Sequence, residues 1–227
     1  MEAVIGEAVF RYLRWRVQRH LLRSPFLDSI EHLYRRLSRA RNVILPVEMY
    51  GSKAGNPGQV ARVSLATLTR KSATPPWKGR LLYDIVRQAK PKRILELGTH
   101  LGFGTLYLAA AAPHADIHTV EASPVLSEKA RLHFRLLGIK PKVHVGLFEE
   151  VIPTLAGEWH ILYIDGDHRA TALQRYVSLL YDSIRPGGLI ICDDIFWNWD
   201  MLNGWRVLTK SYPEKVYSVG PFGIVFK

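Results

Sequence analysis

The chain has 227 residues, of which 48% are hydrophobic and 22% are charged, a balance typical of a globular protein in water. This length is enough for one α/β domain of about 150 residues with an N-terminal extension. Apolar runs fall short of the roughly 20 residues of a membrane span, and charges interrupt the N-terminal region where a signal peptide is apolar. The single cysteine excludes an internal disulfide. We therefore expect a cytoplasmic protein.

Positive charge is concentrated in the first third of the chain. The net charge is +11, and residues 1–80 hold 15 Lys and Arg against 5 Asp and Glu, which leaves the rest nearly neutral. A basic segment beside a neutral domain indicates an anionic partner, such as nucleic acid, a phospholipid surface or an acidic substrate. The alternative is a solvated helix face that contributes only to solubility, and the composition leaves both interpretations open.

Residues 1–73 are predicted to form a basic helical extension. Apolar side chains at helical spacing predict helices over residues 3–22, 28–41 and 60–69. Residues 50–58 are rich in glycine and polar side chains and predict an exposed loop. The two prolines at 75 and 76 mark the entry to a main domain over residues 74–227.

The main domain alternates short apolar segments with amphipathic ones. The segments predict strands over 93–98, 117–122, 142–146, 160–165, 188–194, 215–220 and 223–227, and helices over 81–89, 105–112, 124–137, 149–155, 170–183 and 200–211. Nearly continuous apolar strands between helices are typical of a parallel sheet covered on both faces. The last connection is too short for a crossover helix. We therefore expect an α/β, Rossmann-like fold whose seven-stranded sheet is mostly parallel, with an antiparallel last strand.

Glycines and acidic side chains follow the first two strands of this domain, where an open α/β sheet binds its ligand. The first strand leads into Glu96-Leu97-Gly98-Thr99-His100-Leu101-Gly102, whose glycines let the backbone approach a ligand closely. Its spacing differs from the G-x-G-x-x-G of dinucleotide-binding proteins. Glu121 ends the second strand, where a carboxylate can accept hydrogen bonds from both ribose hydroxyls. The alternative for Glu121 is a solvated carboxylate without a ligand.

Further motifs follow the fourth and fifth strands, namely Ile164-Asp165-Gly166-Asp167-His168 and Cys192-Asp193-Asp194-Ile195-Phe196-Trp197, with an R-P-G-G segment between them. The glycine-rich turn resembles motif I of class I S-adenosylmethionine-dependent methyltransferases. The ordered set over residues 74–227 is similar to the catechol and caffeoyl-CoA O-methyltransferases and their bacterial relatives. The resemblance implies S-adenosylmethionine as cofactor, with contacts from Glu96, Gly98, Thr99, Gly102, Glu121, Ala122, Gly146 and Asp165.

The resemblance also implies a divalent cation. In the family an aspartate ending the fourth strand and an Asp-Asp or Asp-Asn pair ending the fifth bind the metal, and the matching positions are Asp165, Asp193 and Asp194. Three converging carboxylates raise one another's pKa unless a cation lies among them, and oxygen ligands suit Mg²⁺, Ca²⁺ or Mn²⁺. The alternative is that Asp193 and Asp194 only cap a helix or bind the cofactor.

Asp165 and His168 are the candidate catalytic residues. An unperturbed histidine has a pKa near 6.5, so His168 is a candidate general base, but it can equally cap the following helix or orient Asp165. Well-known relatives carry a lysine near this position, so the family role is not carried over to His168. The aromatic rings of Trp197 and Trp199 either wall a substrate pocket or belong to the core.

The sequence thus predicts a cytoplasmic, homodimeric O-methyltransferase that uses S-adenosylmethionine, with metal assistance, on a small hydroxylated acceptor. One alternative is a tRNA-modifying methyltransferase whose basic N-terminal region grips phosphates. Another is a non-enzymatic protein that keeps this fold and makes peripheral contact with a membrane surface or a partner through its first helix.

Overall fold

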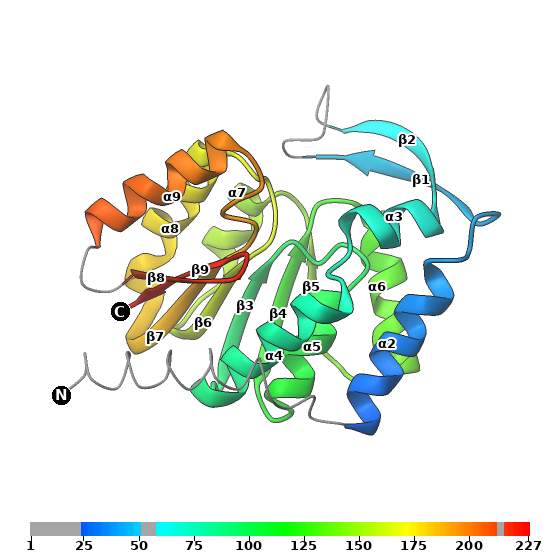
Figure 1. The fold of residues 1–227 in the computed structure, drawn as a ribbon, viewed down its shortest axis with the longest axis horizontal. Coiled ribbons are helices and arrows are strands. Elements are labelled where there is room, and N and C mark those ends of the chain that lie inside the picture. The colour runs from blue at the N-terminus through cyan, green and yellow to red at the C-terminus, as the bar shows by residue number, and fades with distance from the viewer. Residues whose placement is uncertain (1–23, 51–57, 213–215) are drawn as a thin grey trace.

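A seven-stranded sheet forms the centre of the computed structural model, which describes residues 24–50, 58–212 and 216–227 (Figure 1). The strand order is β5-β4-β3-β6-β7-β9-β8. The strands are β3 (Arg93–Leu97), β4 (Asp116–Glu121), β5 (Lys142–Val145), β6 (Trp159–Ile164), β7 (Ile184–Cys192), β8 (Val216–Val219) and β9 (Phe222–Phe226). The last strand, β9, is antiparallel to both its neighbours, while the pairs from β5 to β7 are parallel. The predicted fold class is confirmed.

Helices cover both faces of this sheet, as its alternating side chains require. On β6, Ile161 and Tyr163 join one buried cluster and Leu162 and Ile164 join the other. The first cluster includes helices α2 (Pro25–Leu37), α3 (Leu65–Ser72), α4 (Pro76–Ala89), α5 (Phe103–Ala111) and α6 (Pro124–Leu136). The second includes α7 (Phe148–Val151), α8 (Ala170–Leu180) and α9 (Trp199–Ser211), with 3₁₀ turns η2 (Ile152–Thr154) and η3 (Tyr181–Ser183) after α7 and α8. Within the described residues no helix is long and apolar enough to cross a bilayer.

A two-stranded sheet precedes the main domain and corrects one prediction. Strands β1 (Ile44–Met49) and β2 (Gln59–Ser64) pair antiparallel, so part of the helix predicted over residues 60–69 is a strand. The β-branched Val60 and Val63 pair with β1, and this cross-strand pairing outweighs the helical spacing. Helix α3 begins only at Leu65, after Ser64 accepts a hydrogen bond from the backbone of Thr67.

Two predicted segments fall outside the described residues. They are the helix over residues 3–22 and most of the loop over residues 50–58. The domain boundary at residues 73 and 74 stays a prediction. In the described part, α2 and α3 contribute to the same buried cluster as α4 and α5.

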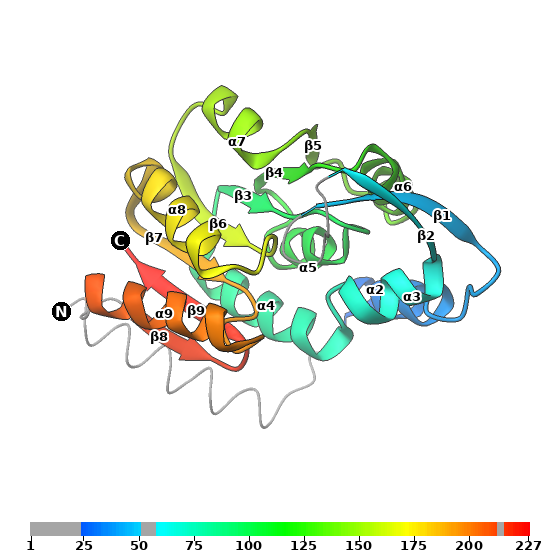
Figure 2. The same cartoon turned by 90° about the horizontal axis from the view of Figure 1, so that it is seen from above.

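Helix α4 begins five residues earlier than the spacing predicts, because Pro76 occupies a first helical position that needs no backbone N–H. The additional first turn carries Lys78 and Gly79, both buried. Gly79 lies directly against the ring of Tyr107 on α5, where a Cβ would collide with the ring. α4 and α5 lie side by side in both views (Figures 1 and 2). The glycine thus permits a close helix contact that sets the position of the neighbouring Lys78.

Replacing Gly79 with Ala is expected to destabilise the protein. Overpacking costs about 1–3 kcal/mol, and the better helix propensity of alanine offsets up to about 1 kcal/mol of it. Urea denaturation should therefore show a lower free energy of unfolding for Gly79→Ala than for the wild type. Arg87→Ala, on the exposed side of α4, is the control and should change it by less. A Gly79→Ala protein as stable as the wild type would contradict the close packing.

Candidate functional site

A cavity of about 440 Å³ opens at the carboxyl ends of β3, β4 and β6. Its lining comes from the turns after β3 and β4, from residues 165–169 after β6, and from residues 47–50 at the end of β1. The β1–β2 pair lies above this end of the sheet (Figure 1). The cavity therefore has a floor made by the main sheet and a roof made by the preceding strands.

The turn after β3 approaches the turn after β6 without a side chain between them. Gly98 has a φ of +108°, and a Cβ at this position would collide with the backbone carbonyl of Asp165. Only glycine combines this backbone angle with this close approach. The two turns that the sequence placed at the ligand site are therefore in direct contact.

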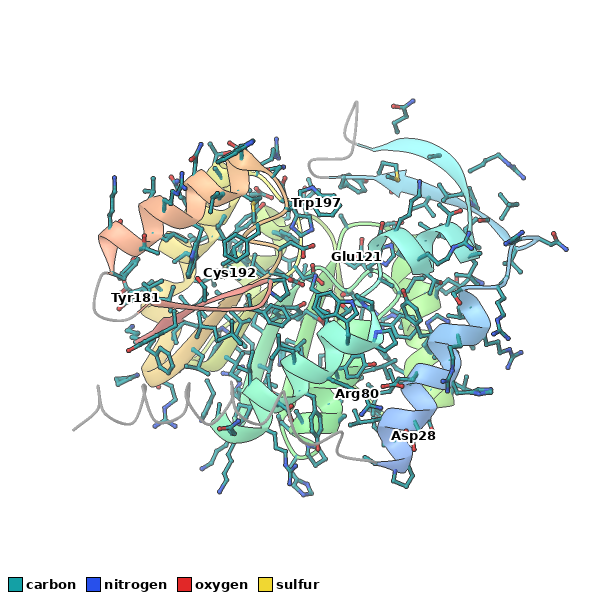
Figure 3. All side chains as sticks on the ribbon, in the orientation of Figure 1. Asp28, Arg80, Glu121, Tyr181, Cys192 and Trp197 are labelled. Carbon is teal, nitrogen blue, oxygen red and sulfur yellow. The ribbon has the colours of Figure 1, made fainter. Side chains whose placement is uncertain are left out.

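Glu121 is held at the end of β4 by backbone donors. Its Oε2 accepts a hydrogen bond from the N–H of His100 at 2.7 Å, and its Oε1 accepts one from the N–H of Ser123 at 2.9 Å. Burial raises the pKa of this carboxyl, while those backbone hydrogen bonds lower it. Each oxygen keeps a second lone pair for a ligand hydroxyl. Glu121 lines the cavity, and Figure 3 shows it at the same end of the sheet as Trp197.

Other predicted cofactor residues differ in their relation to the cavity. Gly98, Glu121, Ala122 and Asp165 line it, and Thr99 lines a small adjoining space. The remaining three support the turns from behind: Glu96 is buried within β3, Gly102 precedes α5, and the N–H of Gly146 donates to the carbonyl of Glu121.

The three predicted metal ligands do come together, but they are not equivalent. Asp193 is fully buried, and its Oδ2 accepts from the Tyr163 hydroxyl at 2.6 Å and from Lys78 Nζ at 2.8 Å. Its Oδ1 accepts from the N–H of Asp194 at 2.6 Å. Both carboxylate oxygens of Asp193 are therefore engaged within the protein.

Lys78 is a member of this cluster that the sequence analysis missed. Its Nζ lies 2.8 Å from Asp194 Oδ1 as well as 2.8 Å from Asp193 Oδ2. Burial lowers the pKa of Lys78, but the carboxylates of Asp165, Asp193 and Asp194 more than offset this and hold it above its usual value. The lysine is therefore a charged ammonium. A lysine in a first helical turn is common, and nothing in the local sequence indicates its partner.

The remaining donors face one another across a short gap. The side chains of Asp165, His168 and Asp194 each offer a ligand atom, and these atoms lie within 4.8 Å of one another. His168 Nε2 is 3.9 Å from Asp165 Oδ1 and 4.0 Å from Asp194 Oδ2. Asp193 is not a member of this group, so the geometry favours His168 in its place.

The backbone around these donors is strained. Among the described residues, positive φ at non-glycine positions occurs at Lys90, which ends α4, and at His100, Asp167 and Asp194. The last three follow the carboxyl ends of β3, β6 and β7. Such conformations persist where the surroundings hold them, and they cluster at functional sites.

His168 and the tryptophans resolve two of the open alternatives. The N–H of Ala170, at the start of α8, is bound by Asp200 rather than by His168. Trp197 and Trp199 are 51% and 75% exposed, so neither belongs to the core. The Trp197 ring centroid lies 6.0 Å from that of His168, which places this ring beside the acidic cluster.

Comparison with known proteins agrees with this geometry. Residues 95–195 match the family described as a methyltransferase domain. A catechol O-methyltransferase of Mycobacterium tuberculosis is 30% identical over 138 residues, which are 59% of each chain. An SAH-bound methyltransferase of Podospora anserina superposes with a TM-score of 0.65 at 19% identity, over 99% of this chain and 96% of that one. An O-methyltransferase of Bacillus cereus in complex with SAH superposes with a TM-score of 0.61 at 17% identity, over 94% of this chain and 96% of that one.

Residues 95–195 are therefore similar to a methyltransferase domain, and the fold of the chain is that of the solved methyltransferases compared above. The chain spans less than two thirds of the length of the curated relatives it matches. Both Lys78 and the β1–β2 roof lie before the matched segment of the methyltransferase domain. The parts of the site that the sequence analysis missed are therefore those outside the family pattern.

Glu96, in the segment that matches the methyltransferase family, has a buried carboxyl group with one unpartnered oxygen. Its Oε2 accepts from the Thr105 hydroxyl at 2.5 Å, and its Oε1 is buried without a hydrogen-bond partner. Burial raises its pKa from 4.5 to about 7, because the ionised form is poorly solvated there. The folded protein therefore favours the protonated form.

Glu96→Gln is expected to remove a pH dependence of stability. Since the folded pKa is about 7 and the ordinary value is 4.5, the wild type loses stability relative to Glu96→Gln as pH rises from 4.5 to 7, by about 3 kcal/mol in total. Urea denaturation of both proteins at pH 5 and pH 8 measures this difference. Glu158→Gln, at an exposed position, is the control. A difference between Glu96→Gln and the wild type that does not change with pH would disprove the assignment.

Proposed function

We propose that this protein is an enzyme that transfers the methyl group of S-adenosylmethionine to a hydroxyl oxygen of a small acceptor. The observation that carries the proposal is a single cavity that joins the Gly98 turn and Glu121 to Asp165 and His168. A cofactor-binding floor and a charged group able to act on a hydroxyl are thus side by side. The similarity to a catechol O-methyltransferase and to methyltransferases in complex with SAH is consistent with this chemistry.

The cofactor is proposed to lie along the turns after β3 and β4. Glu121 would accept the ribose hydroxyls, since its carboxylate is already oriented by two backbone donors. Leu126, Leu147 and Phe148 line the cavity beside Ala122 and offer apolar surfaces to an adenine ring. Asp165 would lie at the positively charged methionine end.

The acidic cluster fits a divalent cation at one particular set of donors. Asp165, His168 and Asp194 present two carboxylates and one imidazole within 4.8 Å. Burial raises the pKa of Asp193 well above its usual value and that of Asp165 to about 6, so a cation beside them would favour their ionised forms. A bound cation would lower the pKa of an acceptor hydroxyl. The two carboxylates suit Mg²⁺, Ca²⁺ or Mn²⁺, while the imidazole is a usual ligand of transition-metal ions.

Residues of the chain itself would align the acceptor. Asp165 and Asp194 would hold the charged side of the acceptor site, while Trp197 provides an aromatic wall next to His168. Holding oxygen, methyl and sulfur in line is the main contribution expected of the protein. A cavity of about 440 Å³ that also takes the cofactor leaves room for a small acceptor only.

The other predicted partners have less support from the comparisons and the structure. Neither the family match nor the relatives reported above favour the tRNA-modifying alternative. Residues 1–23, which carry a net charge of +3 out of the chain's +11, lie outside the described part of the chain. A homodimeric assembly, a cytoplasmic location and contact with a membrane surface remain expectations from the sequence.

Cofactor binding is the first test of the proposed function. Calorimetry should give a dissociation constant for S-adenosylhomocysteine in the micromolar range, where 1 μM corresponds to about −8 kcal/mol. Glu121→Ala removes two acceptors for the ribose and should weaken binding by about 1–3 kcal/mol. Glu128→Ala removes the same charge from an exposed position on α6 and should leave the affinity unchanged. If folded wild-type protein binds no cofactor, the proposed function is wrong.

Metal dependence is the second test. In an assay with a catechol acceptor, EDTA should abolish turnover and added Mn²⁺ or Mg²⁺ should restore it. Asp165→Asn and Asp194→Asn should lower the apparent metal affinity, since each removes one charged ligand. The competing mechanism uses His168 as the sole base, and predicts that EDTA has no effect while His168→Ala is nearly inactive. Unchanged turnover in EDTA would exclude the metal.

A further inference from the structure

Lys78 occupies the space between the two aspartates that the sequence assigned to a metal. Its side chain is 8% exposed, and its Nζ lies 2.8 Å from a carboxylate oxygen of each. An oxygen-bound cation would need the same oxygens at about 2.0–2.6 Å. A divalent ion therefore cannot bridge Asp193 and Asp194 while the ammonium is in place.

We propose that Lys78 is the resident cation of this cluster: it compensates the buried Asp193 and the partly exposed Asp194 without metal and keeps divalent cations weakly bound on the side of His168. The proposal rests on the proposed function only in taking this cluster as the candidate metal site. The contacts that carry it belong to the chain alone.

The first argument is how the carboxylate oxygens are distributed. Asp193 is saturated by Tyr163, Lys78 and the N–H of Asp194. Asp194 gives Oδ1 to Lys78, while its Oδ2 faces His168 at 4.0 Å. The ammonium therefore divides the cluster into an inner half that needs no metal and an outer half open to one.

The second argument is charge. A buried carboxylate such as Asp193 is strongly unfavourable unless a cation or a bound proton compensates it, and the Lys78 ammonium lies 2.8 Å from one of its oxygens. Lys78 is tethered to α4, which Gly79 packs tightly against α5, so its contribution does not depend on metal concentration. The same ammonium repels a divalent ion that shares Asp194.

Lys78→Met tests the proposal, because methionine keeps the length of the side chain and removes its charge. Mn²⁺ titration by calorimetry, without cofactor or acceptor, should show at least tenfold tighter binding to Lys78→Met than to the wild type. The melting temperature of the variant should fall in EDTA and recover in Mn²⁺, whereas that of the wild type should respond much less. Equal or weaker Mn²⁺ binding by Lys78→Met, or a melting temperature that Mn²⁺ does not recover, would overturn the proposal.

Two further variants separate charge from packing. Arg80→Met removes a cation two residues away on α4, where Arg80 pairs with Glu31 on α2 and lies near Asp28 (Figure 3), and should change neither Mn²⁺ binding nor its effect on melting. Lys78→Met combined with Asp193→Asn removes one charge of each sign and should melt near the wild-type temperature in EDTA. If the double variant is as metal-dependent as Lys78→Met, charge compensation is not the role of Lys78.

The outcome is independent of the test of the proposed function. Melting and Mn²⁺ titration use neither cofactor nor acceptor, so a wild type that fails to bind S-adenosylhomocysteine would disprove the proposed function and leave this comparison intact. Conversely, all these variants are expected to bind S-adenosylhomocysteine, since Lys78 and Arg80 do not line the cavity. A cluster that ignores Mn²⁺ in both the wild type and Lys78→Met would reject the resident cation alone.

Discussion

Compensation of three carboxylates gathered in a largely buried place is the constraint on which the site depends. The compensating groups are the Tyr163 hydroxyl, the backbone N–H of Asp194 and the ammonium of Lys78, which lies on a helix distant in sequence. That ammonium reaches the carboxylates because α4 lies against α5 at a position where only glycine fits. The packing of α4 on α5 and the charge balance at the strand ends are therefore coupled, because a change in that packing would move the ammonium of Lys78.

The central sheet and half of the site follow from local sequence. Nearly continuous apolar segments gave the strands, and the carboxyl ends of parallel strands necessarily meet at one edge. Glu121 and Asp165 end two such strands, and they line the same cavity. Gly98 was expected to allow a close approach, and the approach is to the backbone of Asp165. In these cases the short-range pattern and the long-range arrangement have the same cause.

The remainder depends on contacts between distant segments. The strand over residues 59–64 has helical spacing, and only pairing with β1 makes it a strand. Asp193 and Asp194 are adjacent and both contact Lys78, yet only Asp193 accepts from Tyr163 and only Asp194, whose φ is +53°, faces His168. Lys78 lies 116 positions before Asp194, and its role exists only once α4 has docked. Periodicity and motif spacing contain no information on such contacts.

The roof over the cavity has a consequence for how acceptor choice can diversify. Residues 47–50 face the cavity from β1, outside the segment that matches the methyltransferase family, whereas the charged floor lies within it. If the proposed function holds, substitutions on the roof can therefore reshape the cavity without disturbing the charged groups on its floor. Engineering of acceptor specificity should accordingly begin at Val47 and Met49, where apolar side chains can be exchanged at constant charge.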